Sequence, residues 1–278
     1  MLTFPNAKIN IGLNIVARRS DGYHNLETIF YPVSLCDTLE IVPAREPQRG
    51  EVQLTTYGIP VEGAAQDNLV VKAYHLLLSE CEMPPVEIYL FKNIPSGAGM
   101  GGGSSDAAFA LKMLNELFSL GLDTAALEAR ASLLGADCAF FIQDKPLFAT
   151  GIGNVFAPAC CDLSSYRIAI VKPPVFVSTR EAYSGVQPHP AQLSPVSAVK
   201  QPIEEWKEIL VNDFEPHIFA AHPKIEETKE ELYRCGALYA SMSGSGSAVY
   251  GIFRELPKGL KEHFPGCFYF ANEEKQGA

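Results

Sequence analysis

The stretch of sequence on which the fold assignment depends is Pro95-Ser96-Gly97-Ala98-Gly99-Met100-Gly101-Gly102-Gly103-Ser104-Ser105-Asp106. It lies between a strand predicted for residues 86–91 and an Ala/Leu-rich helix predicted for residues 107–118. Its glycines lack a Cβ, so the backbone can adopt positive φ and come close to a ligand. Ser104 or Ser105 can cap the helix, whose N-terminal amides and dipole favour an anion. The stretch therefore predicts a phosphate-binding loop.

Three other classes of phosphate loop differ from this stretch in spacing or context. A Walker A loop ends in G-K-[ST], where this chain has Gly103-Ser104-Ser105. Gly97, Gly99 and Gly102 match G-x-G-x-x-G, but residues 92–96 separate the first glycine from the strand, whereas a dinucleotide turn starts at the strand end. A protein-kinase loop would need H-R-D and D-F-G elements, and the sequence contains neither. A flexible linker is disfavoured by the flanking strand and apolar helix.

The net charge of the 278-residue chain is -10, and 47% of its residues are hydrophobic. This composition indicates a folded globular protein without overall attraction for nucleic acid or anionic membranes, so we expect neither as a partner. No obligatory protein partner is implied. A polyanionic small molecule would be bound by a few placed cations, backbone amides or a divalent metal.

The chain has seven cysteines, an odd number, and no C-x-x-C spacing. The pattern indicates reduced thiols rather than a disulfide framework or a structural zinc site. The N-terminal residues lack a basic segment followed by an apolar run, so we expect no secretory signal, and no apolar stretch is long enough to span a membrane. These observations predict a cytoplasmic protein.

Periodicity predicts mixed α and β structure. Residues 8–15 alternate polar and apolar, which is typical of a strand with one buried face, and Lys8 and Asn10 then point the same way. Asn68 is placed to cap a helix over residues 69–78. A change in the sequence pattern predicts an N-terminal domain, residues 1–157, and a C-terminal domain, residues 158–278. Further strands are predicted at 38–42, 51–56, 248–253 and 268–270, helices at 203–210 and 223–233, and a long loop at 185–202.

Residues 95–108 resemble the P-x-x-x-G-[LM]-G-x-S-S-x-A signature of the GHMP kinases. Ala7-Lys8-Ile9-Asn10 resembles the first motif of that family, and Ser241-Met242-Ser243-Gly244-Ser245-Gly246-Ser247-Ala248 resembles the third. The resemblance implies an α+β fold of two GHMP kinase domains with the active site in the interdomain cleft. It also implies that ATP is the co-substrate, that Mg²⁺ is required, and that residues 95–105 bind ATP. Asn68 either contacts the adenine side or only caps its helix.

Three narrower elements resemble one branch of this family, whose substrate is a cytidine diphosphate derivative of methylerythritol. They are Arg19 to Leu26, an R-x-D-G-Y-H-x-L element; Gly135 to Phe141, in which Ala139 replaces the usual proline; and Asn212 to Glu215. The resemblance implies ATP-dependent phosphorylation of the 2-hydroxyl of that substrate, in the non-mevalonate route to isoprenoid precursors. The alternatives are a GHMP kinase for homoserine or mevalonate, and a nucleotide-binding sensor that has lost catalysis.

The resemblance also assigns roles to the catalytic residues. Asp137 is expected to accept the hydrogen bond of the attacking hydroxyl, and Lys8 to pair with Asp137 and offset the charge that builds there. Retention of both residues disfavours the sensor. The magnesium ligands are not fixed by the motifs, and Ser104, Ser105 and Asp137 are the candidates.

Substrate contacts are expected from two further segments. Tyr23 would stack on the cytosine base and His24 would make a polar contact to it, while Asn10 would orient the substrate. Thr179 and Tyr183 are candidates for the opposite wall of the base site, although an aromatic residue such as Tyr183 is as often a core residue.

Overall fold

The fold is that of a computed structural model, which describes residues 1–44 and 52–272. The chain forms two compact units that are each discontinuous in sequence. This division differs from the contiguous domains 1–157 and 158–278, which stay a prediction. Unit 1 comprises Met1–Lys8, Pro32–Ser96 and Gly101–Lys145, and unit 2 comprises Ile9–Tyr31, Gly97–Met100 and Pro146–Ala278.

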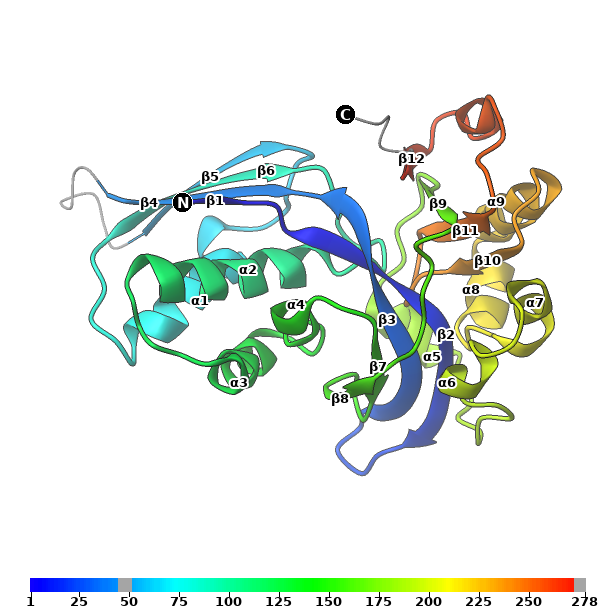
Figure 1. Ribbon diagram of the computed structural model, residues 1–278, viewed down its shortest axis with the longest axis horizontal. Helices are drawn as coiled ribbons and strands as arrows, with labels where there is room; N and C mark the ends of the chain where they lie inside the picture. The colour runs from blue at the N-terminus through cyan, green and yellow to red at the C-terminus, as the bar shows by residue number, and fades with distance from the viewer. Residues whose placement is uncertain (45–51, 273–278) are drawn as a thin grey trace. The chain divides into compact units, whose positions relative to one another are not determined.

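Unit 1 is built on a four-stranded sheet of order β1-β4-β6-β5, with strands Leu2–Thr3, Thr38–Pro43, Val86–Lys92 and Val52–Gly58. The pairing of β4 with β6 is antiparallel and sets Leu39 opposite Leu90 and Ile41 opposite Ile88, all fully buried. Helices α1 (Leu69–Leu78) and α2 (Gly102–Leu117) lie side by side along this sheet (Figure 1). Their apolar sides and the sheet form the core of the unit.

Helices α1 and α2 each begin at a defined cap. The side chain of Asn68 accepts a hydrogen bond from the Val70 amide at 3.0 Å, so the capping role expected for Asn68 is confirmed. Helix α2 starts at Gly102, five residues before the predicted start, and Gly101 is its N-cap with φ +69°. The prediction that Ser104 or Ser105 caps α2 is therefore wrong, because both serines lie inside its first turns. Glycines 102 and 103 are weak helix formers, which hid this start in the sequence.

Unit 2 contains two four-stranded sheets. The first has the order β2-β3-β7-β8, with strands Asn6–Arg18, His24–Cys36, Leu147–Thr150 and Val155–Pro158. The first residues of β2 and the last residues of β3 belong to unit 1. The second has the order β10-β11-β9-β12, with strands Tyr239–Met242, Val249–Phe253, Arg167–Lys172 and Phe268–Ala271. Helices α8 (Glu215–Ala221) and α9 (Pro223–Arg234) bury Ile218, Ile225 and Leu232 in the apolar core of this unit.

The other helices are short except for α3 (Thr124–Leu134), and the predicted loop over residues 185–202 is partly wrong. That segment contains one helical turn, α6 (Pro195–Ala198), which has Pro195 at its first position and is too short to show a period. The remaining short helices are η2 (Ala65–Asp67), α4 (Phe140–Gln143), α5 (Thr179–Ser184), η3 (Ile203–Glu205), α7 (Trp206–Ile209) and η4 (Leu260–His263).

The other predicted strands are found, with one correction to burial. Strand β2 covers the predicted strand at residues 8–15, but every residue from Asn6 to Ile15 is buried, so the prediction of a single buried face is wrong. Its polar side chains are thus enclosed by protein. Lys8 is therefore a buried residue and not a solvent-exposed surface lysine. Residue 51, the first of the strand predicted at 51–56, lies outside the described residues.

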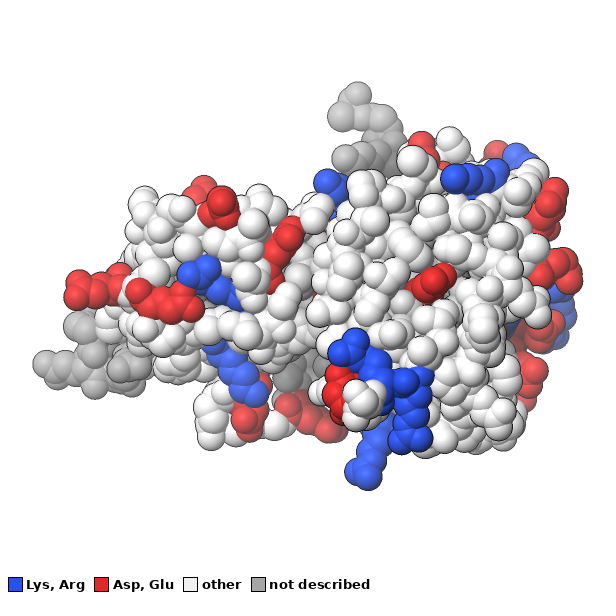
Figure 2. All heavy atoms as spheres, turned by 90° about the horizontal axis from the view of Figure 1, so that it is seen from below, with Lys and Arg blue, Asp and Glu red and all other residues white. Residues whose placement is uncertain are grey.

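The charged side chains are of both signs on the face shown in Figure 2, where acidic groups lie beside basic ones. Among the described residues, no helix has both the length and the apolar character that crossing a membrane requires.

Candidate active site

A buried lysine and a partly exposed aspartate form an ion pair in unit 1. The Nζ atom of Lys8 lies 3.4 Å from Oδ2 of Asp137, and their side chains are 4% and 34% exposed. Burial lowers the pKa of Lys8, and the charge of Asp137 and its hydrogen bond offset part of this effect. The expected pairing of Lys8 with Asp137 is therefore seen, with the carboxylate on the side that solvent reaches.

The end of the glycine-rich loop adjoins this pair. A Cβ added to Gly101 would lie 3.3 Å from Cε of Lys8 and 3.0 Å from the ring of Phe141, and Gly101 has a left-handed φ. Helix α2 starts at the next residue, and the amides of its first turn lack carbonyl partners within the helix. Gly103 is exposed, and a Cβ there would meet only Leu69 at 3.9 Å. An anion could thus approach the start of α2 beside Lys8.

The two serines of the loop differ in surroundings. Ser104 is partly exposed, and its Oγ lies 4.0 Å from the position of a Cβ on Gly135, so it adjoins the turn that carries Asp137. Ser105 is fully buried, and its Oγ has no hydrogen-bond partner. Ser104 is therefore the better placed of the two to meet a ligand near Asp137.

A second buried lysine, Lys92, contacts the first turns of α2. The Nζ atom of Lys92 lies 2.6 Å from Asp106 on α2 and also donates to Asp37, and all three side chains are buried. Asp37 in addition accepts hydrogen bonds from the amides of Asn93 and Ile94, at 2.6 and 2.8 Å. Lys92 thereby ties the first part of α2 to the ends of β4 and β6. We call Lys92, Asp37 and Asp106 the buried triad.

Burial changes the pKa values of Lys92 and Asp106 in opposite directions. It lowers the pKa of Lys92, but the two carboxylates outweigh it and hold that pKa above its usual value. Burial raises the pKa of Asp106 to about 7, and the charge of Asp37 adds to this while Lys92 opposes it. Oδ1 of Asp106 is buried without a hydrogen-bond partner, which fits a carboxyl group whose pKa burial raises.

The third motif contacts the first part of the glycine-rich loop within unit 2. The Ser243 hydroxyl donates to the Gly99 carbonyl at 2.9 Å, and the Ala248 amide donates to the Ala98 carbonyl at 3.3 Å. A Cβ on Gly99 would lie 1.8 Å from the Ser243 carbonyl oxygen, so only glycine fits at that position. The close approach of two backbones explains why both motifs are rich in glycine.

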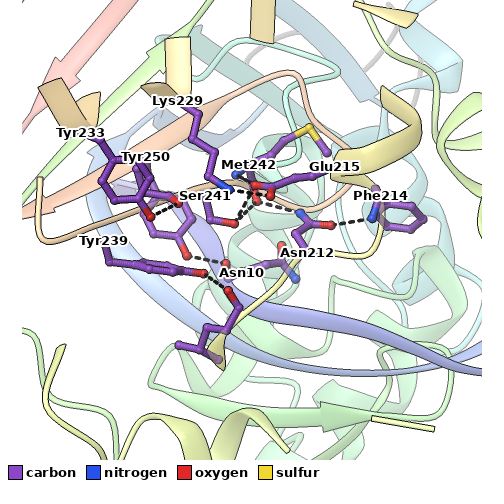
Figure 3. A network of polar contacts seen from close by, with 12 residues as sticks. Asn10, Asn212, Phe214, Glu215, Lys229, Tyr233, Tyr239, Ser241, Met242 and Tyr250 are labelled. Atoms are coloured by element: carbon purple, nitrogen blue, oxygen red, sulfur yellow. Dashed lines mark hydrogen bonds and ion pairs between the residues drawn. The ribbon is translucent and has the colours of Figure 1, made fainter. Parts of the chain in front are cut away.

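A buried polar network holds the third motif in place (Figure 3). Asn212 donates to the carbonyls of Met242 and Gly244, at 2.8 and 2.9 Å. Glu215 accepts from the Met242 amide at 2.8 Å and from the Ser241 hydroxyl at 3.1 Å. The segment 212–215, for which no role was predicted, thus supports residues 241–244.

Asn10 is buried and held by two contacts in unit 2. Its Nδ2 donates to the Thr28 hydroxyl at 3.0 Å, and its carbonyl accepts from the Tyr250 hydroxyl at 2.8 Å (Figure 3). A Cβ on Gly244 would lie 3.2 Å from its Oδ1, so Asn10 also adjoins the third motif.

The candidate base-binding residues form a ring cluster in unit 2. Tyr23 is 62% exposed, whereas the ring of His24 stacks on Tyr183 with centroids 5.1 Å apart. The ring of Tyr183 also meets Phe214 edge-on, with centroids 4.8 Å apart, so this tyrosine packs against the core and supports His24. Partial burial lowers the pKa of His24, and nearby Arg18 adds to this. Thr179 is exposed at the start of α5.

Comparison with known proteins identifies the family. The model of the GHMP kinases N terminal domain matches residues 68–145, which contain the glycine-rich loop and Asp137, and the model of the GHMP kinases C terminal domain matches residues 196–265, which contain the third motif. The chain belongs to the GHMP kinase family. It is therefore a kinase, the expected α+β fold is confirmed, and ATP is the phosphate donor that this family uses.

Curated relatives cover nearly the whole chain. A 4-diphosphocytidyl-2-C-methyl-D-erythritol kinase of Bacteroides thetaiotaomicron is 59% identical over 91% of this kinase and 92% of the relative. The enzyme of the same name from Salinibacter ruber is 37% identical over 90% and 88%. A crystal structure of 4-(cytidine 5'-diphospho)-2C-methyl-D-erythritol kinase superposes with a TM-score of 0.81 at 31% identity, covering 98% of both chains. The mevalonate kinase of Methanococcus jannaschii, at 14% identity and a TM-score of 0.73 over 98% of this chain and 97% of its own, shares the fold.

Two groups of residues next to the motifs of this kinase were not predicted to contribute. The buried triad joins positions 37, 92 and 106, which are too far apart in sequence for any periodic pattern to connect them. The available signal was the charged Asp106, which stands directly after two serines and before the apolar run of residues 107–111. The support role of Asn212 was signalled only by its place in a short polar motif.

Proposed function

We propose that this kinase transfers the γ-phosphoryl group of ATP to the 2-hydroxyl of 4-diphosphocytidyl-2-C-methyl-D-erythritol, in the non-mevalonate route to isoprenoid precursors. The names of the relatives, at up to 59% identity, support this substrate. The pairing of a buried lysine with a more exposed aspartate beside the glycine-rich loop is the structural observation that carries the proposal.

Asp137 acts on the attacking hydroxyl in this proposal. One of its oxygens, Oδ2, faces Lys8, and the carboxylate accepts the hydroxyl proton as the oxygen–phosphorus bond forms. Lys8 stays beside the carboxylate, holds its orientation and stabilises the negative charge that gathers near the transferring group.

The phosphates of ATP bind at the start of α2. The amides after Gly101 have the orientation that an anion requires, and the helix dipole adds to their effect. The glycine-rich loop, residues 95–105, would follow the phosphates with its backbone. Asn68 uses Oδ1 for its cap, which leaves its amide nitrogen as the group that could reach the adenine side.

Hard oxygen donors near Asp137 fit a magnesium ion. The partly exposed hydroxyl of Ser104 and the Asp137 carboxylate adjoin the same turn and are the residues that would hold it; the fully buried Ser105 is the poorer candidate. When bound, Mg²⁺ would neutralise charge on the phosphates.

The ring cluster would recognise the cytosine base. Tyr23 presents an exposed ring for stacking, and His24, fixed by Tyr183, offers ring nitrogens for a polar contact. Because its pKa is lowered, His24 is neutral at neutral pH and can donate from one nitrogen and accept at the other. Asn10 would orient the sugar alcohol, and Thr179 would line the opposite wall.

The proposal places the enzyme in the cytoplasm, acting without an obligatory protein partner. All seven cysteines are free thiols, and the more deeply buried Cys138 and Cys161 have pKa values raised by burial to about 11 and about 12. Unreactive thiols of this kind suit a reducing compartment.

The test is ADP release with ATP and magnesium, offering the cytidine substrate beside mevalonate and homoserine. We expect turnover with the cytidine compound alone. Turnover with another alcohol would keep the kinase and overturn the substrate, and no turnover with any alcohol would favour a nucleotide sensor. Phosphorus NMR of the product would show whether the 2-hydroxyl is the acceptor.

A further inference from the structure

Three side chains with different donor atoms lie close together in unit 2. The proposed kinase activity uses none of these three residues. Glu231 and Cys235 lie four residues apart at the C-terminal end of α9, and His263 ends η4. One oxygen, one sulfur and one nitrogen of these residues all lie within 4.8 Å of one another, and no other group of this kind occurs in residues 1–44 and 52–272.

The distances are close to those of a tetrahedral zinc site. Oε1 of Glu231 lies 3.7 Å from Sγ of Cys235 and 2.7 Å from Nδ1 of His263. Bond lengths of about 2.3 Å to sulfur and about 2.1 Å to nitrogen or oxygen would separate oxygen from sulfur by roughly 3.6 Å and oxygen from nitrogen by roughly 3.4 Å. The first distance already fits, and for the second the His263 ring has to shift so that its nitrogen and the Glu231 oxygen separate by roughly 0.7 Å more. The His263 side chain is 51% exposed and free to do so.

The site has room for a fourth ligand. A hollow of about 200 Å³ adjoins Glu231 and His263 and is also lined by Phe264 and Cys267. A water molecule there would complete the coordination that zinc adopts with three protein ligands. The positive charge of Arg234 would repel a bound cation, since its Nη1 lies 2.9 Å from the other oxygen of Glu231. The Arg234 side chain is 69% exposed, however, and can move into solvent.

We propose that Glu231, Cys235 and His263 bind one Zn²⁺ ion and so join the end of α9 to η4. The sulfur, nitrogen and carboxylate donors suit a borderline ion and disfavour Mg²⁺, which prefers oxygen. On binding, the Cys235 thiol releases its proton to solvent and His263 binds as neutral imidazole through Nδ1. The site is independent of the magnesium site proposed near Asp137.

The experiment titrates the full-length protein, freed of metal with EDTA, with Co²⁺ as a spectroscopic substitute for Zn²⁺. We expect one equivalent to give a thiolate-to-cobalt charge-transfer band and the intense visible bands of tetrahedral cobalt, both removed by added Zn²⁺. Cys235→Ser should remove the charge-transfer band, and His263→Gln should weaken cobalt binding at least roughly 100-fold. Cys267→Ser is the matched control, because this thiol lines the same hollow and is not one of the three donors.

A second measurement distinguishes this site from adventitious metal binding. Zn²⁺ at a hundredfold excess over its Kd should raise the melting temperature of the wild type by about 5 °C or more and that of Cys235→Ser by none. Absence of the thiolate band from the wild type, its persistence in Cys235→Ser, or its loss in Cys267→Ser would each overturn the proposal. Kinase turnover with magnesium should be the same in all these variants.

Discussion

Two lysines of unit 1 are equally buried, each with a side chain 4% exposed, and each faces aspartate, but their partners differ. Lys8 faces Asp137, a carboxylate that solvent reaches, at 3.4 Å. Lys92 lies between two buried carboxylates: it contacts Asp37, and its Nζ atom lies 2.6 Å from Oδ2 of Asp106. In the proposed function the same pair of residue types serves the reaction at Lys8 and the scaffold at Lys92, and the two places differ in the exposure of the carboxylate. Four predictions test this difference.

The largest effect is expected from Asp137→Asn. The change removes the proposed proton acceptor, so kcat should fall by roughly 10² to 10⁴ while nucleotide binding is retained. Steady-state ADP release and a direct nucleotide-binding titration measure the two quantities. Asp162→Asn, at an exposed aspartate of unit 2, is the control and should leave kcat unchanged. Turnover of Asp137→Asn within a factor of ten of wild type would remove Asp137 from the mechanism.

Lys92→Met should cause the largest loss of stability. It leaves two carboxyl groups in a buried site without their common cation, and breaking a buried ion pair in this way costs about 3–5 kcal/mol. Urea denaturation followed by circular dichroism measures the loss, since the single tryptophan, Trp206, lies in unit 2 and does not report on unit 1. Lys145→Met, at an exposed lysine of unit 1, should change stability by less than about 0.5 kcal/mol. Equal stability of the two variants would contradict the scaffold role.

The sequence predicted the parts of both sites that depend on local pattern. Strand β2, helix α1 and the glycine-rich loop have strong periodic or glycine signals, and the resemblance to GHMP kinases supplied the pairing of Lys8 with Asp137. Strands β7 and β10, of four residues each, are too short to show a period and were missed.

Contacts between distant segments were not predictable in this way. The buried triad joins Asp37 at the end of β3 to Lys92 and Asp106, and nothing in the composition near any one of these residues indicates the other two. The same holds for Asn212, whose partners Met242 and Gly244 are 30 and 32 residues further along the chain. Single-sequence reasoning found Lys8 through a motif, and it had no motif for Lys92.

The pH dependence of stability should show the triad directly. The pKa of Asp106 is raised by burial from 3.8 to about 7, so the folded protein holds this proton more tightly than the unfolded chain. The resulting stability is fully present below about pH 4 and is lost as the pH rises through about 7, by at most about 4 kcal/mol. Asp106→Asn, which cannot ionise, should flatten this decline in urea denaturation between pH 4 and 8. An unchanged slope would assign the proton to another group.

Of the two buried lysines, Lys8 should be the one whose replacement by Met changes stability less. Removal of this lysine leaves Asp137 with a side chain that is already one-third exposed, so its charge stays hydrated, and the desolvation cost of Lys8 disappears. We expect the free energy of unfolding to change by less than about 1 kcal/mol, in either direction, by the same urea measurement. Turnover should nevertheless fall at least roughly 100-fold, because the charge that holds Asp137 and offsets the transferring group is lost. A loss of stability as large as that of Lys92→Met would mean that Lys8 is also a scaffold residue, and that exposure of the partner carboxylate does not separate the two lysines.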